Sequence, residues 1–161
     1  MIATTRRRIE YLLCFLFLTV GGVIYLLYRP RILMLHVIAD GLGLGGCIDS
    51  LRGVADQWPL PSFLVFCVPN GLWSTAYILL IDGLIAGRSK RWQRLVGVSV
   101  IPFLGAMSEL LQASGTIPGT FDWGDLLCYL LPLLVYVMVA SRKQEIRQQY
   151  AIGKSSKKDY Q

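Results

Sequence analysis

Four polar side chains flank a short loop that separates two apolar runs. Glu109 and Gln112 lie three residues apart near the end of the run that begins at Leu95, so a helix would place them on one face. Asp122 and Asp125 open the next apolar run with the same spacing. Two helix ends would therefore meet at one polar patch. Converging carboxylates either share a proton or bind a cation, so acid–base chemistry, with or without a divalent cation, is the chemistry that these residues could support.

The two aspartates also have a purely structural interpretation. Asp122 is placed to cap the helix that follows the loop, and Asp125 would then lie in its first turn, where a carboxylate favours the helix dipole. The sequence leaves capping and a functional role as alternatives for both. Glu109 is the strongest functional candidate, because an ionisable side chain within an apolar span is costly and by default marks a functional site.

The elements that must position these residues are membrane-spanning helices. The chain has 161 residues, of which 54% are hydrophobic and 16% charged, and its mean hydropathy is +0.52. A spanning helix needs about 20 mostly apolar residues, and four segments qualify: 11–28, 62–81, 95–111 and 123–140. We therefore expect an all-α membrane protein with one transmembrane domain, residues 1–141, and a basic tail, residues 142–161.

The basic residues predict how the chain crosses the cell membrane. With four spans, the two ends of the chain and the loop after the second span carry 13 of the 16 Lys and Arg, and the opposite side carries Arg29, Arg31 and Arg52. The positive-inside rule then places both termini in the cytoplasm. These charges sit at the ends of apolar runs rather than among surface aromatics, which argues against nucleic-acid binding. The tail is expected to form a short helix, fray into a disordered end and be attracted to anionic lipid.

Residues 29–61 are expected to be interfacial or re-entrant. Their apolar part, 32–44, is short for a span, contains His36 and Asp40, and runs into a cluster of glycines. His36 and Asp40 have the spacing of a hydrogen-bonded helical pair, which would suit a metal or proton-transfer site. The alternative is a histidine that is satisfied at the interface.

Other polar residues carry weaker predictions. Asn70, Ser74 and Tyr77 form one stripe along the second span, either as substrate contacts or as polar contacts between helices. The basic turn 87–94, with Asp82 just before it, is predicted to be a membrane anchor. Three cysteines fall inside spans and Cys47 falls in a loop, and their spacing suggests neither a disulfide framework nor a zinc site.

The polar patch resembles the VanZ-like family of small membrane proteins. The resemblance covers about residues 95–139 and rests on E-L-L-Q (109–112), a loop with Gly and Pro, and F-D-W-G-D-L-L (121–127). Glu109, Gln112, Asp122 and Asp125 match the family pattern of E-x-x-Q followed by D-x-x-D. The chain departs from that pattern where the family has arginine, asparagine and a frequent glycine and this chain has Thr120, Tyr129 and Pro132.

The resemblance implies a role in the cell envelope, and some members of the family are linked to teicoplanin resistance. We therefore expect a protein that acts on or shields an extracytoplasmic component, such as an envelope lipid or a glycopeptide-related ligand. One alternative is an enzyme that acts on a lipid-linked headgroup, with Glu109 as general acid or base and the aspartates holding a divalent cation. Another is a structural subunit or small-solute transporter. No nucleophile elbow, phosphate-binding loop or H-E-x-x-H motif is present in the sequence.

Overall fold

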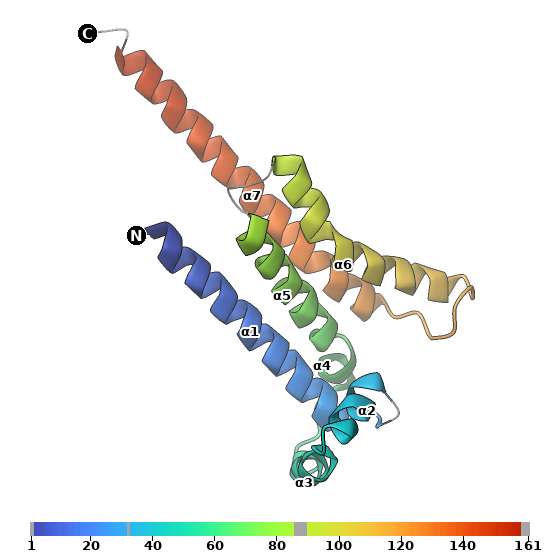
Figure 1. Ribbon diagram of the computed structural model, residues 1–161. Helices are drawn as coiled ribbons and strands as arrows, with labels where there is room; N and C mark the ends of the chain where they lie inside the picture. Colours follow the sequence, from blue (N-terminus) through green and yellow to red (C-terminus); the bar gives the residue numbers. More distant parts are fainter. Residues whose placement is uncertain (1, 32, 86–89, 159–161) are drawn as a thin grey trace.

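In the computed structural model, all regular secondary structure of the described residues is α-helix. The structure describes the backbone over residues 2–31, 33–85 and 90–158, and side chains over 7–31, 33–85, 90–142 and residue 145. Within these ranges the helices are α1 (Ile2–Tyr28), α2 (Met34–Gly41), α3 (Gly45–Ala55), α4 (Ser62–Phe66), α5 (Val68–Ile85), α6 (Arg91–Ala113) and α7 (Trp123–Lys158). Figure 1 shows α1, α5 and α7 running side by side, α6 bending midway so that its second half projects to one side, and α2 and α3 gathered at one end.

The prediction of an all-α protein with four spans is confirmed. Four stretches in the described residues are long and apolar enough to cross a membrane: Arg7–Tyr28, Ser62–Ile85, Arg91–Ala113 and Trp123–Arg142. The second is divided at Cys67 into α4 and α5. Pro69 explains the break, because proline has no N–H to donate to the carbonyl of Val65 and its ring crowds that carbonyl.

Helix α5 is the centre of the bundle. It packs against α1 on one side and against α6 and α7 on the other, and α6 and α7 also pack together. Small residues allow the backbones to approach closely, as is common between helices in membranes. A Cβ on Gly71 would lie 3.4 Å from Cys128 Cβ of α7, and a Cβ on Gly105 of α6 would overlap the ring of Tyr129.

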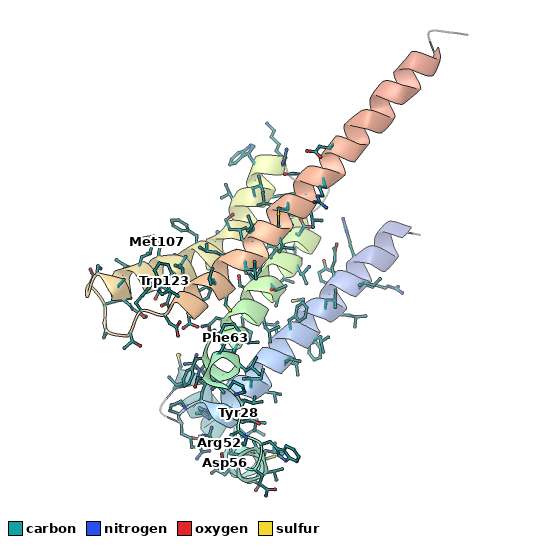
Figure 2. The ribbon with its side chains drawn as sticks, turned by 180° about the vertical axis from the view of Figure 1, so that it is seen from behind. Tyr28, Arg52, Asp56, Phe63, Met107 and Trp123 are labelled. Atoms are coloured by element: carbon teal, nitrogen blue, oxygen red, sulfur yellow. The ribbon has the colours of Figure 1, made fainter. Side chains whose placement is uncertain are left out.

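The segment between the first two spans folds into two short helices. At 8 and 11 residues, α2 and α3 are too short to cross a membrane. Arg52 of α3 fixes the segment to the end of α1, because its Nη1 donates to the carbonyls of Leu26 (2.8 Å) and Arg29 (2.7 Å). Arg52 is labelled with Tyr28 in Figure 2, at the end of the bundle where α3 meets α1.

Two local predictions were wrong. Cys47 lies in α3 rather than in a loop, although it is exposed. The tail was expected to be a short helix with a disordered end, but α7 runs without a break from Trp123 through Lys158. The physical reason is that residues 141–149 contain no proline or glycine and are rich in Arg, Lys, Gln and Glu, which favour helix.

Candidate functional site

Asp122 caps helix α7. Its Oδ1 accepts a hydrogen bond from the backbone N–H of Gly124 at 2.7 Å, and its carbonyl accepts one from the N–H of Leu126 at 3.1 Å. This is the geometry of an N-cap residue, in which a side-chain oxygen satisfies a backbone donor in the first turn. The capping interpretation of Asp122 is therefore confirmed. One carboxylate of the polar patch has a structural role whatever else it does.

Glu109 joins α6 to the start of α7. The residue is 6% exposed, and its Oε2 accepts a hydrogen bond from the backbone N–H of Asp122 at 3.2 Å. In a capping box this donor is bound by the side chain at the third helical position, here Asp125. Glu109 takes that place from a neighbouring helix. The residue that the sequence singled out is thus buried and directed at the same helix terminus as Asp122.

Because Glu109 binds the N–H of Asp122, the Asp125 carboxylate is available to accept a hydrogen bond from α5. Asn70 donates from Nδ2 to Asp125 Oδ1 at 3.0 Å and to the carbonyl of Phe66 at 3.3 Å. Cys67 Sγ lies 3.9 Å from the other carboxyl group, at Asp122 Oδ2. The structure thus brings α5, α6 and α7 together at one polar cluster, which we call the outer cluster: Asn70, Glu109, Asp122 and Asp125. Met107 of α6 and Trp123 of α7 mark this end of the molecule in Figure 2.

Gln112 lies beside the outer cluster rather than within it. A Cβ built on Gly119 would be 2.7 Å from Gln112 Cδ, so the glutamine side chain packs against the loop between α6 and α7. Gly119 has a φ of 140°, a conformation that other residues rarely adopt. Gln112 therefore has the position of a residue that shapes the loop.

Arg29 is a neighbour of the outer cluster that sequence reasoning missed. Its Nη2 donates to the carbonyl of Phe66 at 2.9 Å, the same carbonyl that Asn70 binds, and its guanidinium lies 4.6 Å from the centre of the Phe66 ring. The sequence showed only a basic residue directly after the first span. Among the described side chains, no Lys or Arg forms an ion pair with Glu109, Asp122 or Asp125.

His36 and Asp40 do not form the pair that their spacing suggested. His36 is fully buried, and neither ring nitrogen has a hydrogen-bond partner within the described part of the chain. Its ring stacks against Tyr25, with centroids 6.4 Å apart. Asp40 is exposed and pairs with Arg31 at 3.1 Å. Helix α2 therefore buries the histidine against α1 while Asp40 faces out, so the predicted pair of His36 with Asp40 was wrong.

The remaining residues of the stripe on α5 hold helices together. Ser74 donates to the carbonyl of Tyr129 on α7 at 3.2 Å, and Tyr77 donates to the carbonyl of Gly97 on α6 at 2.7 Å. Each of the two hydrogen bonds joins α5 to a different helix, as polar side chains often do in membranes. Of the stripe, only Asn70 reaches a carboxylate of the outer cluster.

A second polar group lies on the same helices further along the bundle. Asp82 of α5 is 5% exposed, forms an ion pair with Arg94 of α6 and accepts a 2.6 Å hydrogen bond from the hydroxyl of Tyr136 on α7. We call these three residues the inner triad. The turn 87–94, with Asp82 just before it, was predicted to be a membrane anchor; residues 87–89 lie outside the described part of the chain, and the contact of Asp82 with Arg94 and Tyr136 was not foreseen. The available signal was an aspartate within an apolar run, three residues before the end of α5.

The described residues contain no group of three His, Cys, Asp or Glu side chains that could hold a metal ion. Glu109, Asp122 and Asp125 are thus close in space without being arranged as a divalent-cation site. They accept hydrogen bonds from the Asn70 amide, from backbone N–H groups and, at 3.9 Å, from the Cys67 thiol. Carboxylates that accept hydrogen bonds in this way can also accept charge-assisted hydrogen bonds from a cationic group.

Comparison with known proteins adds no assignment to this geometry. No protein-family model, no curated protein and no solved structure matches this chain.

Proposed function

We propose that this chain is a multi-pass protein of the cell membrane whose outer cluster binds a cationic group of a cell-envelope component. The observation that carries the proposal is the unbalanced charge of the cluster. Three carboxylates, Glu109, Asp122 and Asp125, gather at one end of three helices, and the described Lys and Arg side chains form no ion pair with any of them. An ammonium group of a lipid or peptide would offset part of that charge.

The burial of Glu109 supports this interpretation. A carboxylate in a poorly solvated position is stable only when it is protonated, paired or well hydrogen-bonded. Glu109 has a single described donor, the N–H of Asp122, at a long 3.2 Å. A bound ammonium group would add charge-assisted hydrogen bonds, which are stronger than those between neutral groups. The resemblance to the VanZ-like family supports an envelope component as the source of that group.

The topology in this proposal has both termini in the cytoplasm. The start of α1, the end of α5 and the C-terminal extension of α7 lie towards one end of the bundle, and the start of α7, next to the loop that joins it to α6, lies away from that end (Figure 1). Because 13 of the 16 basic residues belong to the first end, the positive-inside rule assigns the outer cluster to the extracytoplasmic side.

Cys47 tests this topology. It is exposed on α3, whereas Cys14 and Cys67 are buried and Cys128 is partly buried within the spans. A membrane-impermeant maleimide should label Cys47 in intact cells and leave the other three unlabelled. The Cys47→Ser variant is the control and should show no labelling. Labelling of Cys47 only after the cells are opened would place α3 on the cytoplasmic side and contradict the proposal.

Binding is tested by removing charge without removing hydrogen-bonding capacity. Glu109→Gln and Asp125→Asn keep an oxygen acceptor for the N–H of Asp122 and for Asn70, but they lose the negative charge. Cells that express each variant should lose any change in teicoplanin susceptibility and in extracted envelope lipids that the wild-type protein confers, at normal membrane abundance. Glu145→Gln is the matched control, because Glu145 is an exposed carboxylate on α7 outside the cluster. Full activity of both cluster variants would show that the carboxylates are structural.

A further inference from the structure

A cavity of about 550 Å³ lies beside the inner triad. It is lined by Glu10 of α1 and by residues of α5, α6 and α7, so all four candidate spans contribute to it. The volume is within the range of ligand pockets, roughly 300–1,000 Å³. The loop between α6 and α7 and the outer cluster contribute nothing to its lining. This cavity is therefore a separate feature from the outer cluster.

The deeper part of the cavity is apolar. Its walls include Ile78 and Leu79 of α5 and Pro132 and Val135 of α7, and the hydroxyl of Thr75, which also lines it, donates to the carbonyl of Gly71. The lining residues of α7 extend from 132 to 140, a length of about 12 Å at 1.5 Å per residue. The apolar part of this cavity, between α5 and α7, suits a hydrocarbon chain.

The other part of the cavity is charged and lies at the level of the lipid headgroups. Glu10, Arg91 and Arg94 are all within four residues of the start of a candidate span. Arg91 is exposed, with its Nη2 3.4 Å from Ser141 Oγ. Guanidinium groups bind phosphate through paired, charge-assisted hydrogen bonds. The polarity of the cavity thus changes from charged at the membrane surface to apolar towards the middle of the membrane.

The inner triad fixes one of these arginines. Asp82 Oδ1 accepts hydrogen bonds from Arg94 Nε at 3.0 Å, from Arg94 Nη2, and from the Tyr136 hydroxyl at 2.6 Å. The Asp82 side chain is only 8% exposed, whereas the Arg94 side chain is 32% exposed. Asp82 therefore fixes the Arg94 guanidinium, with Tyr136 bonded to the same Asp82 oxygen, and part of the Arg94 side chain remains exposed at the cavity. A preorganised side chain loses less entropy when it binds a ligand.

We infer that this cavity binds one phospholipid, with an acyl chain between α5 and α7 and the phosphate at Arg91 and Arg94. A phospholipid has the same order of groups as the cavity, a charged head at the membrane surface and a chain directed inward. With both termini in the cytoplasm, the lipid comes from the cytoplasmic leaflet, where anionic lipids attract basic residues close to the membrane. Lipid binding here does not depend on the ligand of the outer cluster.

The test uses full-length protein in detergent and phosphatidylglycerol with a diazirine in one acyl chain. After irradiation, the mass of the intact wild-type protein should show saturation at one adduct, located by peptide mapping within residues 75–82 or 132–140. Val135→Trp fills the cavity and should abolish the saturable adduct. Val137→Trp is the matched control, because Val137 is on α7 but does not line the cavity. Arg91→Gln should raise the half-saturating lipid concentration about tenfold, as expected for loss of a charge-assisted hydrogen bond.

Two further measurements make the result decisive. If the melting temperature shows that Val135→Trp does not fold, Val139→Trp blocks the same wall and replaces it. Inorganic phosphate should not compete with the lipid, because it lacks the chain. Labelling that never saturates, equal labelling of the Val135 and Val137 variants, or full competition by inorganic phosphate would each overturn the inference.

Discussion

The two ends of the helix bundle accommodate carboxylates in opposite ways. In the inner triad, Asp82 is paired with Arg94 and bound by the Tyr136 hydroxyl, so its charge is balanced within the protein. In the outer cluster, Glu109 is almost as buried as Asp82 but accepts one described hydrogen bond, from a backbone N–H. Both sites join the same helices, α5, α6 and α7.

This difference separates a site whose charge is balanced within the protein from one whose opposite charge, in our proposal, comes from a ligand. A buried charge costs several kcal/mol unless it is paired and hydrogen-bonded. The inner triad meets that requirement and so can hold Arg94 in a fixed position. The outer cluster leaves negative charge without an opposite charge, which destabilises it unless protons or a ligand bind. Stability measurements should therefore respond more strongly to changes in the inner triad, and functional measurements to changes in the outer cluster.

The largest loss of stability is expected from Arg94→Leu. The change leaves the Asp82 carboxylate buried with Tyr136 as its only described side-chain partner, and removal of one member of a buried ion pair costs about 3 kcal/mol. Thermal unfolding of the detergent-solubilised protein should show this loss. Adding Asp82→Asn to the same protein should recover most of it, because the uncompensated charge is gone. If the single variant melts like the wild type, the ion pair is not a determinant of stability.

Gly105→Ala should break the close approach of α6 and α7 that assembles the outer cluster. The added methyl group would overlap the ring of Tyr129 on the neighbouring helix, and overpacking of this kind costs about 2 kcal/mol. The control is Gly22→Ala on α1, where a Cβ meets no atom within 4 Å. The control should be neutral or slightly stabilising, because alanine favours helix more than glycine does. Equal melting of the two variants would mean that α6 and α7 pack differently from the structure.

Asn70→Ala removes the amide that donates a hydrogen bond to Asp125. We expect the free energy of unfolding to fall by about 1.5 kcal/mol, because this is the lower end of the range for a hydrogen bond to a charged group. Asp125 is only half-buried, so water can replace the amide in part. The control is Thr19→Ala on α1, which removes only a hydrogen bond to the carbonyl of Phe15, four residues away. A loss for Asn70→Ala as large as that for Arg94→Leu would show that both sites are equally dependent on pairing.

The smallest effects concern the helix cap. Asp122→Ala should cost about 1 kcal/mol because the N–H of Gly124 loses its acceptor, and Asp122→Asn should cost almost nothing because asparagine caps about as well as aspartate. The same two variants sharpen the assignment of function. If the charge of Asp122 contributes to ligand binding, the asparagine variant loses the envelope phenotype while its melting temperature stays at the wild-type value.

The sequence by itself determined the features that depend on local composition. Apolar length and a low content of charged residues specify four candidate spans, and the run interrupted by His36, Asp40 and glycines is too short to qualify as another. The cap at Asp122 was also predictable, because an N-cap bonds to the backbone of its own helix. These features require no knowledge of how one helix is rotated against another.

Only the tertiary structure decided which distant polar groups meet. Glu109 binds the N–H of a residue 13 positions away, and Asp82 meets Tyr136 54 positions away. The spacing of His36 from Asp40 also gives no sign that His36 is buried against Tyr25 with no hydrogen-bond partner among the described residues. The reason is physical: the rotation and crossing of packed helices select the contacts, and small residues such as Gly71 and Gly105 permit them. Hydropathy shows that a helix is buried in a membrane, but it does not show which of its faces meets which neighbour.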